Sequence, residues 1–205
     1  MPQPHDAGAT QSRYSAVAIL LHWTIAALLL TNLVLGLQSG NLKGLAQFSL
    51  LQWHKSLGIT VLLLSVTRLA WRLVHRPPPY PPGLGPWERA AAGAVHWGFY
   101  ILMLGLPLTG WIMVSASPTN IPTLLYKTIP WPHLGLVHAL PMATRKNLDD
   151  LFGDIHATLA WTAIGLIALH VAAAIKHQVW SRDLVLWRMA PLPGLAPGRS
   201  GSEDA

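Results

Sequence analysis

Four histidines lie within or at the ends of long apolar stretches of this sequence. Burying an ionisable side chain in such a stretch costs free energy, so a functional role is the first hypothesis for each of them. His156 and His170 are fourteen residues apart, which is close to four turns of an α-helix. Their imidazoles therefore project from nearly the same helix face, about 21 Å apart along the axis. If that helix crosses a membrane, one imidazole lies near each surface.

Each of these imidazoles needs a partner at its own depth. His22 lies a few residues inside the start of an earlier apolar stretch, and His54 lies at the start of the next one. Because successive spans run in opposite directions, His22 is expected level with His170, and His54 level with His156. The sequence therefore predicts two bis-histidine sites stacked across the bilayer, which we call the inner pair (His22, His170) and the outer pair (His54, His156).

Two separate pairs of imidazoles suit haem, whose iron accepts two axial histidines and whose apolar ring fits a helix bundle. Zinc and copper usually take three or four protein ligands gathered at one place. The absence of cysteine excludes thiolate zinc sites, iron–sulfur clusters and covalently attached c-type haem. We predict two haem b groups, although any one of these histidines alone would be interpreted as an interhelical hydrogen-bonding residue.

Arg68 is a further candidate for cofactor binding, because it follows His54 by fourteen residues and so reaches the depth of the inner pair. A charge at that depth needs a counter-ion, and we predict a haem propionate. Arg72 lies one turn further toward the cytoplasm. The alternative is that both arginines snorkel to the headgroups and set the topology.

The composition places these residues in a membrane. Hydrophobic residues make up 52% of the chain and charged residues 11%, against roughly 25% charged in ordinary globular proteins. Four apolar stretches approach the ~20 residues that a transmembrane helix requires. They run approximately over residues 16–37, 53–74, 92–115 and 155–177. The net charge of +6 is spread along the chain, which argues against nucleic acid as a partner.

The loops predict the orientation. The N-terminus, the second loop and the C-terminus, with adjacent helix ends, hold nine Lys and Arg residues, and the other two loops hold five. The positive-inside rule then places both termini in the cytoplasm. We predict an all-α, integral membrane four-helix bundle of up-down-up-down topology, with residues 1–190 as one transmembrane domain and 191–205 as a flexible tail. Within the long loop 116–154, residues 147–154 are expected to form a short interfacial helix, and Ser181 is expected to cap another that contains Leu184.

Several stretches in this order resemble the prokaryotic cytochrome b561 family, and within it the small stand-alone members that act as superoxide:ubiquinone oxidoreductases. The likeness covers all four predicted helices. The matching stretches are Leu21-His22-Trp23, His54-Lys55-Ser56-Leu57-Gly58, Arg68-Leu69-Ala70-Trp71-Arg72, Leu106-Pro107-Leu108-Thr109-Gly110-Trp111, His156-Ala157-Thr158-Leu159-Ala160 and Leu169-His170-Val171.

The resemblance implies that the inner and outer pairs are the axial ligands of two haems, as depth alone suggests. It also implies a bacterial inner-membrane location, a quinone near one haem, and superoxide as the electron donor. Superoxide is an anion, so Lys55, with Lys127, Arg145 and Lys146, is a candidate for attracting it. These charges are otherwise ordinary loop residues.

Two histidines near the inner pair have less certain roles. His96 lies near the start of the third span, at the depth of His22, and either competes with it as a ligand or packs between helices; the family pattern favours His22. His177 follows His170 by two turns and is a candidate proton donor to the quinone. Its alternative is a solvated interfacial histidine.

Three functions remain open from the sequence. The first is a di-haem oxidoreductase that carries electrons from a periplasmic donor to ubiquinone. The second is a haem b membrane anchor of a larger dehydrogenase or hydrogenase, with no substrate of its own. The third is a haem-free small transporter that uses its histidines for proton relay.

Overall fold

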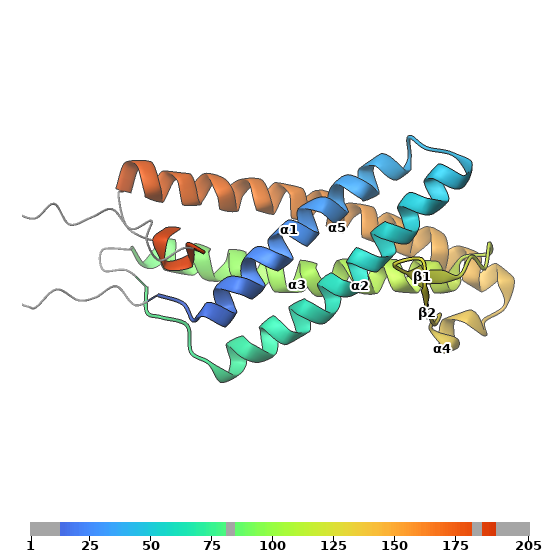
Figure 1. The fold of residues 1–205 in the computed structure, drawn as a ribbon, viewed down its shortest axis with the longest axis horizontal. Helices are drawn as coiled ribbons and strands as arrows, with labels where there is room; N and C mark the ends of the chain where they lie inside the picture. Colours follow the sequence, from blue (N-terminus) through green and yellow to red (C-terminus); the bar gives the residue numbers. More distant parts are fainter. Residues whose placement is uncertain (1–12, 81–84, 182–185, 192–205) are drawn as a thin grey trace, which may run out of the picture.

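The computed structural model describes residues 13–80, 85–181 and 186–191, and over that part the chain forms four long helices (Figure 1). Each is long and apolar enough to cross a membrane. The predicted four-helix, all-helical architecture is therefore confirmed, while the predicted tail lies almost wholly outside the described residues. The helices are α1 (Ala16–Ser39), α2 (Gly44–Val74), α3 (Pro86–Ala116) and α5 (Met142–Lys176).

Successive helices run in opposite directions, as predicted (Figure 1). α1 packs on α2, α3 packs on α5, and α2 contacts α3. Seen in Figure 1, the α1–α2 pair lies obliquely across the α3–α5 pair. The start of α1 and the end of α5 lie at one end of the bundle, which we call the inner end, and the α1–α2 turn lies at the outer end.

Local sequence fixes the helix ends. The Ser15 hydroxyl accepts the N–H of Ala18 at 3.3 Å and caps α1. Gly44 has a φ of +62°, a left-handed conformation that glycine adopts without strain, where the chain turns into α2. α3 begins at Pro86, whose fixed φ suits a first helical position.

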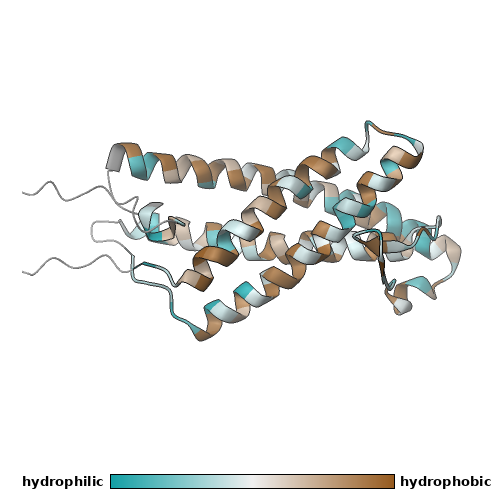
Figure 2. Cartoon of the chain, viewed as in Figure 1, coloured by the Kyte–Doolittle hydropathy of each residue, from teal (hydrophilic) through white to brown (hydrophobic). Residues whose placement is uncertain are grey.

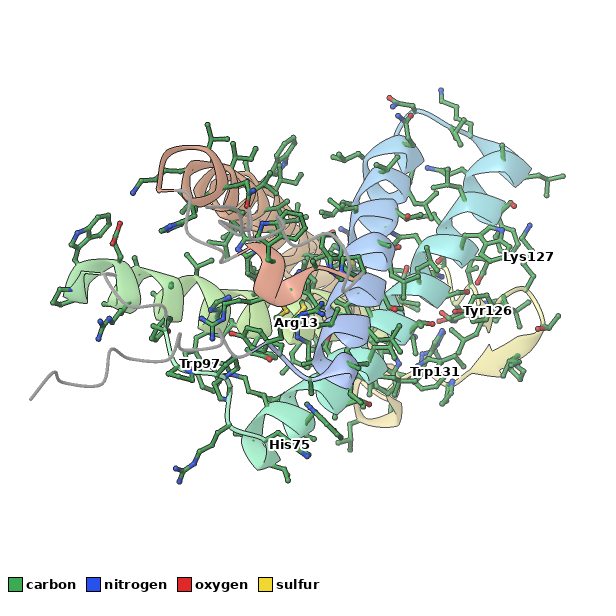
Figure 3. All side chains as sticks on the ribbon, turned by 60° about the vertical axis from the view of Figure 1, so that its left-hand side comes forward. Arg13, His75, Trp97, Tyr126, Lys127 and Trp131 are labelled. Carbon is green, nitrogen blue, oxygen red and sulfur yellow. The ribbon has the colours of Figure 1, made fainter. Side chains whose placement is uncertain are left out.

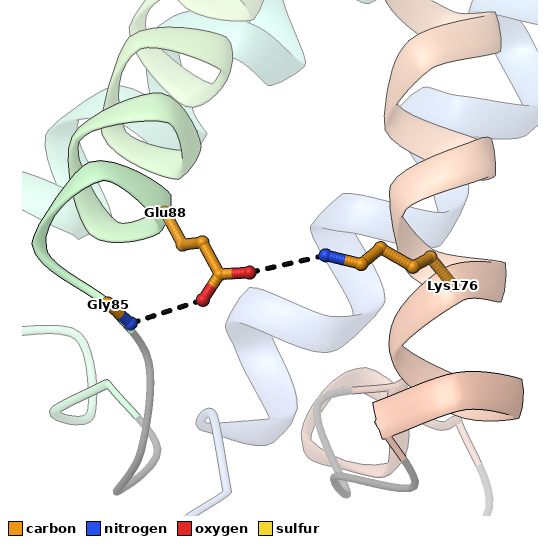
Figure 4. Close-up of polar contacts among 3 residues, drawn as sticks. All are labelled: Gly85, Glu88 and Lys176. Atoms are coloured by element: carbon orange, nitrogen blue, oxygen red, sulfur yellow. Dashed lines mark hydrogen bonds and ion pairs between the residues drawn. The ribbon is translucent and has the colours of Figure 1, made fainter.

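Glu88 joins the start of α3 to the end of α5 (Figure 4). Its carboxylate accepts the backbone N–H of Gly85 at 3.1 Å and pairs with the ammonium of Lys176 at 3.2 Å. A carboxylate in a first helical turn also interacts favourably with the helix dipole. The contact holds these two helix ends together at the inner end.

Three helices begin earlier than predicted, α2 at Gly44, α3 at Pro86 and α5 at Met142. The separate helix expected over 147–154 is wrong, because those residues continue directly into α5. No proline interrupts this segment, and Lys146 pairs with Asp150 one turn on at 2.8 Å. Hydropathy marks the apolar part of a helix and misses its polar extension beyond the lipid.

The long loop is more ordered than predicted. It contains the antiparallel strands β1 (Thr123–Leu125) and β2 (Ile129–Trp131), followed by the short helix α4 (Gly135–His138). Tyr126 and Lys127, at the tip of the hairpin, have φ values of 52° and 63°. Left-handed residues at a hairpin tip match the right-handed twist of the strands.

Gln52 of α2 anchors this hairpin to the bundle. Only 1% of its surface is exposed. Its amide nitrogen donates to the carbonyl of Pro122 at 2.8 Å, and its amide oxygen accepts the N–H of Leu124 at 2.9 Å. The side chain therefore replaces a missing strand partner for β1.

Ser56 and Thr60 continue the same polar stripe along α2 at four-residue spacing. The Ser56 hydroxyl accepts the N–H of Tyr126 at 2.8 Å, and the hydroxyls of Thr60 and Tyr126 lie 2.6 Å apart. Lys127 donates to the Ser49 hydroxyl at 2.8 Å. Tyr126, Lys127 and Trp131 accordingly gather beside α2 in Figure 3.

The outer surfaces of the four helices are apolar over most of their length (Figure 2). Many large apolar side chains are exposed, which in water would mark a binding surface and here fits contact with lipid. They include Leu20, Leu30, Val34, Leu63, Ile101, Trp161, Leu169 and Ile175.

A short 3₁₀ helix, Leu186–Met189, follows α5. Leu184, in the predicted C-terminal helix, lies outside the described residues. The indole of Trp23 donates to the carbonyl of Met189 at 2.7 Å, and Arg188 donates to the carbonyl of Pro79 at 2.7 Å. These bonds tie the end of the described chain to α1 and to the α2–α3 connection.

We expect Gln52→Leu to destabilise the outer end by about 1–3 kcal/mol, because a buried carbonyl and a buried N–H lose their partner. The measurement is thermal unfolding in detergent, with tryptic cleavage after Lys127 as a local probe. Gln38→Leu is the matched control, since Gln38 is exposed and, within the described residues, its side chain hydrogen-bonds only that of Asn41. Equal behaviour of the two variants would contradict the anchoring role.

Candidate functional site

His54 of α2 and His156 of α5 face each other near the outer end, with ring centres 6.1 Å apart. Nδ1 of His54 lies 3.0 Å from the carbonyl oxygen of Asn32, and Nδ1 of His156 lies 3.0 Å from that of Leu106. A carbonyl oxygen only accepts, so each Nδ1 carries the proton. Nε2 of each ring therefore has the lone pair that a metal requires.

Each of these rings lies against a glycine one turn after the carbonyl that it bonds. A Cβ on Gly36 would come within 3.1 Å of Cε1 of His54, and a Cβ on Gly110 within 3.2 Å of Cε1 of His156. The α1–α2 and α3–α5 pairs thus use the same arrangement of carbonyl, glycine and imidazole. A glycine inside a helix lowers stability by about 1 kcal/mol relative to alanine. The close approach of each ring explains why glycine is nevertheless found at these two positions.

Thr109 further fixes the outer pair. Its hydroxyl lies 2.9 Å from the carbonyl oxygen of Leu106 and 3.1 Å from Nδ1 of His156. Pro107, between them, has no N–H and so removes one bond of the α3 ladder. The Leu106-to-Gly110 stretch therefore positions His156, a role that the sequence analysis did not assign.

At the inner end His22 of α1 and His170 of α5 lie with ring centres 6.4 Å apart, as depth predicted. His96 of α3 lies 6.2 Å from His170, so three imidazoles gather there. Nη1 of Arg68 lies 3.0 Å from Nδ1 of His22, and because a guanidinium only donates, that nitrogen accepts. Arg68 thus reaches the level that the sequence predicted.

The two pairs fit an iron bound between axial imidazoles. A ring nitrogen lies about 2.0 Å from a metal that it binds and roughly 1.1 Å from its own ring centre, so two opposed ligands have ring centres about 6.2 Å apart. The inner and outer pairs lie at 6.4 and 6.1 Å. Within residues 13–80, 85–181 and 186–191, no three His, Asp or Glu side chains group as a metal site.

A cavity of about 320 Å³ surrounds the outer pair. Its walls are mostly aliphatic side chains from all four helices, and Thr123 and Trp131 of the hairpin also line it. Lys55, next to His54, lines it too. The cavity therefore combines an apolar interior with a polar roof at the outer end.

Three of the four cations proposed to attract an anion are engaged elsewhere. Arg145, 5% exposed, donates to the carbonyls of Ala116 and Ser117 at 3.2 and 2.6 Å and so caps α3. Lys127 bonds Ser49 and Lys146 pairs with Asp150. Lys55 is half-buried and, within the part of the chain that the structure describes, has no hydrogen-bond or ion-pair partner.

His133 and His138 contact each other in the long loop, with ring centres 5.1 Å apart. Burial lowers the pKa of His133, and the charge of His138 lowers it further. Neither ring lines the outer cavity.

Comparison with known proteins matches residues 13–192 to the sequence model of prokaryotic cytochrome b561. Probable superoxide oxidase CybB of Yersinia pestis is 31% identical over 185 residues, which cover 87% of this chain and 96% of that protein. Cytochrome b561 homolog 1 of Escherichia coli K12 is 30% identical over 184 residues, 88% of this chain and 98% of that protein. Cytochrome b561 homolog 2 of the same strain is 28% identical over 182 residues, with 88% and 92% covered.

We expect Gly36→Ala and Gly110→Ala to displace the outer imidazoles by a few tenths of an ångström and so to weaken haem retention, because each new methyl would press on a ring. Haem per purified polypeptide, from the pyridine haemochrome spectrum, is the measurement. Gly165→Ala is the control, since nothing lies within 4 Å of a Cβ there. Full haem content in both test variants would show that the close approach is not needed.

Proposed function

This chain belongs to the prokaryotic cytochrome b561 family, and on that premise we propose that it is a di-haem oxidoreductase that takes electrons from superoxide and gives them to ubiquinone. Family membership itself implies a multi-pass bacterial membrane protein that binds haem b and transfers electrons. The number of haems, their ligands, the donor and the acceptor are the proposed parts. The matched spacing of the two histidine pairs is the observation that carries the proposal.

The outer haem would be held by His54 and His156, and the inner haem by His22 and His170. The ring separations and the Nδ1 bonds of the outer pair support this assignment. Each bound haem would supply a one-electron redox centre. Because both axial positions are then filled, the residues around the porphyrin edges decide which molecules exchange electrons with it.

Arg68 is proposed to pair with a propionate of the inner haem. An imidazole that binds iron through Nε2 normally carries its proton on Nδ1, and that proton would oppose the guanidinium that now lies 3.0 Å away. Ligation by His22 therefore requires either a fully deprotonated ring or a different partner for Arg68. A carboxylate at the same depth is the simpler solution.

Lys55 is proposed to draw superoxide toward the outer site. Of the four cations considered, Lys55 is the one whose charged group is not bonded to another group within the described residues. It also lines the outer cavity beside His54. A positive charge at the mouth of an apolar cavity attracts small anions. Superoxide loses one electron there and leaves as dioxygen.

His177 is proposed as a proton donor at the quinone site, near the inner end. It caps the C-terminal end of α5 and directly follows Lys176, whose ammonium pairs with Glu88. Ubiquinone takes two electrons and two protons to become the quinol, so two superoxide ions are oxidised for each quinone reduced. The nine-to-five distribution of Lys and Arg supports a cytoplasmic location for this end, and a bacterial inner membrane is part of the proposal.

The chain matches nearly the full length of the relative named as a probable superoxide oxidase, which supports a stand-alone oxidoreductase over a membrane anchor. The deciding experiment is to add superoxide and then ubiquinone to the purified protein. Reduction of the haem followed by quinol formation, without any other polypeptide, is the expected result. A protein that is reduced only in the presence of a co-purifying dehydrogenase subunit would be an anchor.

Replacing His54 or His156 with Ala is expected to remove about half of the bound haem and to leave the other centre low-spin, because each pair binds its own iron. His22→Ala and His170→Ala should do the same at the inner level. Haem content and electron paramagnetic resonance provide the readout. His75→Ala is the control, since His75 stacks on Trp71 outside both pairs; full haem in His156→Ala would refute the ligation.

Lys55→Gln is expected to slow reduction by superoxide roughly 3–10-fold and to weaken its dependence on ionic strength, because one attracting charge is lost. Stopped-flow reduction at several salt concentrations measures both effects. Lys127→Gln is the matched control, because that ammonium binds Ser49 and lies over the Trp53 ring. Equal slowing in the two variants would mean that total charge matters and the position of Lys55 does not.

A further inference from the structure

The roof of the outer cavity is formed by one cross-strand pair of the hairpin. Thr123 and Trp131 are direct partners in the register of β1 and β2, so their side chains lie next to each other on the same face of the ribbon. Both residues line the cavity around the outer imidazoles. The hairpin therefore presents one hydroxyl and one indole to whatever occupies that cavity.

The indole of Trp131 has an unused donor. Its Nε1 is buried and has no hydrogen-bond partner within the described residues. An indole N–H can only donate, and buried donors are nearly always paired. Because Trp131 lines the cavity, an acceptor bound there is a candidate partner for this N–H.

The neighbouring Trp111 differs from Trp131 in that its indole N–H is paired. The two indoles lie with ring centres 5.4 Å apart and line the same cavity. Nε1 of Trp111 donates to the carbonyl of Pro132 at 2.9 Å. Two adjacent indoles thus differ in one respect, that only one of them has its N–H satisfied by the backbone.

The acceptor is expected to be anionic and fixed. Lys55 lines the same cavity and supplies a positive potential, and the aliphatic walls below the roof exclude water from an apolar ring. The porphyrin that the outer pair would hold ends in two carboxylates, which cannot lie among aliphatic side chains. The roof, opposite those walls, is where a carboxylate finds both a donor and a favourable charge.

We propose that Trp131 is a carboxylate-binding residue of the outer haem, whose indole N–H donates to a propionate and is positioned by the bonds of Gln52 and Ser56 to the hairpin. This inference rests on the proposed ligation by His54 and His156. Donation to a propionate reduces the negative charge felt by the iron, so Trp131 raises the reduction potential of the outer haem. The way in which the hairpin is anchored on α2 would thereby influence the reduction potential of the outer haem.

The test is Trp131→Phe in the holoprotein, together with replacement of Trp131 by 3-benzothienylalanine, which keeps the shape of the indole and lacks the N–H. Redox titration and the propionate-bending bands of the resonance Raman spectrum are recorded for each. We expect a lower potential for the outer haem alone and a shifted propionate band in both variants. Trp97→Phe is the control, expected to leave both readouts unchanged, because Trp97 is exposed on α3 and does not line the cavity.

Gln52→Leu tests the positioning part, because it loosens the hairpin without altering Trp131. Its outer-haem potential is expected to move in the same direction as that of Trp131→Phe. An unchanged potential and an unchanged Raman band in the benzothienyl variant would overturn the inference. If that variant were also reduced more slowly by superoxide, Trp131 would instead assist the electron donor. Haem stoichiometry and the low-spin signal, measured on the same samples, report separately on ligation by the outer pair.

Discussion

The hydrogen bonds from the outer imidazoles to backbone carbonyls are the interaction on which the rest of this structure depends. His54 of α2 bonds a carbonyl of α1, and His156 of α5 bonds a carbonyl of α3. In a low-dielectric interior such bonds fix both the tautomer and the orientation of a ring, so Nε2 of each ring keeps its lone pair and a fixed direction. Each bond also joins two helices, so the hydrogen bonds that orient the imidazoles also help to hold the bundle together.

The outer and inner levels differ in how completely the protein prepares them. At the outer level the carbonyl, the glycine and the imidazole recur in both helix pairs, and a hairpin covers the cavity. At the inner level a charged Arg68 contacts His22, and His96 adds a third ring. In the proposed di-haem protein, a guanidinium near one centre and an anchored roof over the other would be two distinct means of setting a redox potential.

The long outer loop owes its order to α2 rather than to its own sequence. Gln52, Ser56 and Thr60 form a polar stripe along α2, and each finds its partner in or next to the hairpin. A two-stranded ribbon is marginal by itself, and the buried bonds of Gln52 supply what a third strand would. Arg145, expected to serve as a surface charge, is instead buried as the cap of α3.

The sequence by itself determined the four helices, their alternation, and the matched depths of the histidines, because hydropathy and the rise of 1.5 Å per residue are local properties of the chain. Isolated glycines such as Gly36 and Gly110 in apolar helices were a signal of close packing that could have been followed. Only the tertiary structure decided which carbonyls hold the rings, where the hairpin lies and that the indole N–H of Trp131 has no partner within the described residues. Those features depend on contacts between residues as far apart as Gln52 and Leu124, and no periodicity along one helix specifies them.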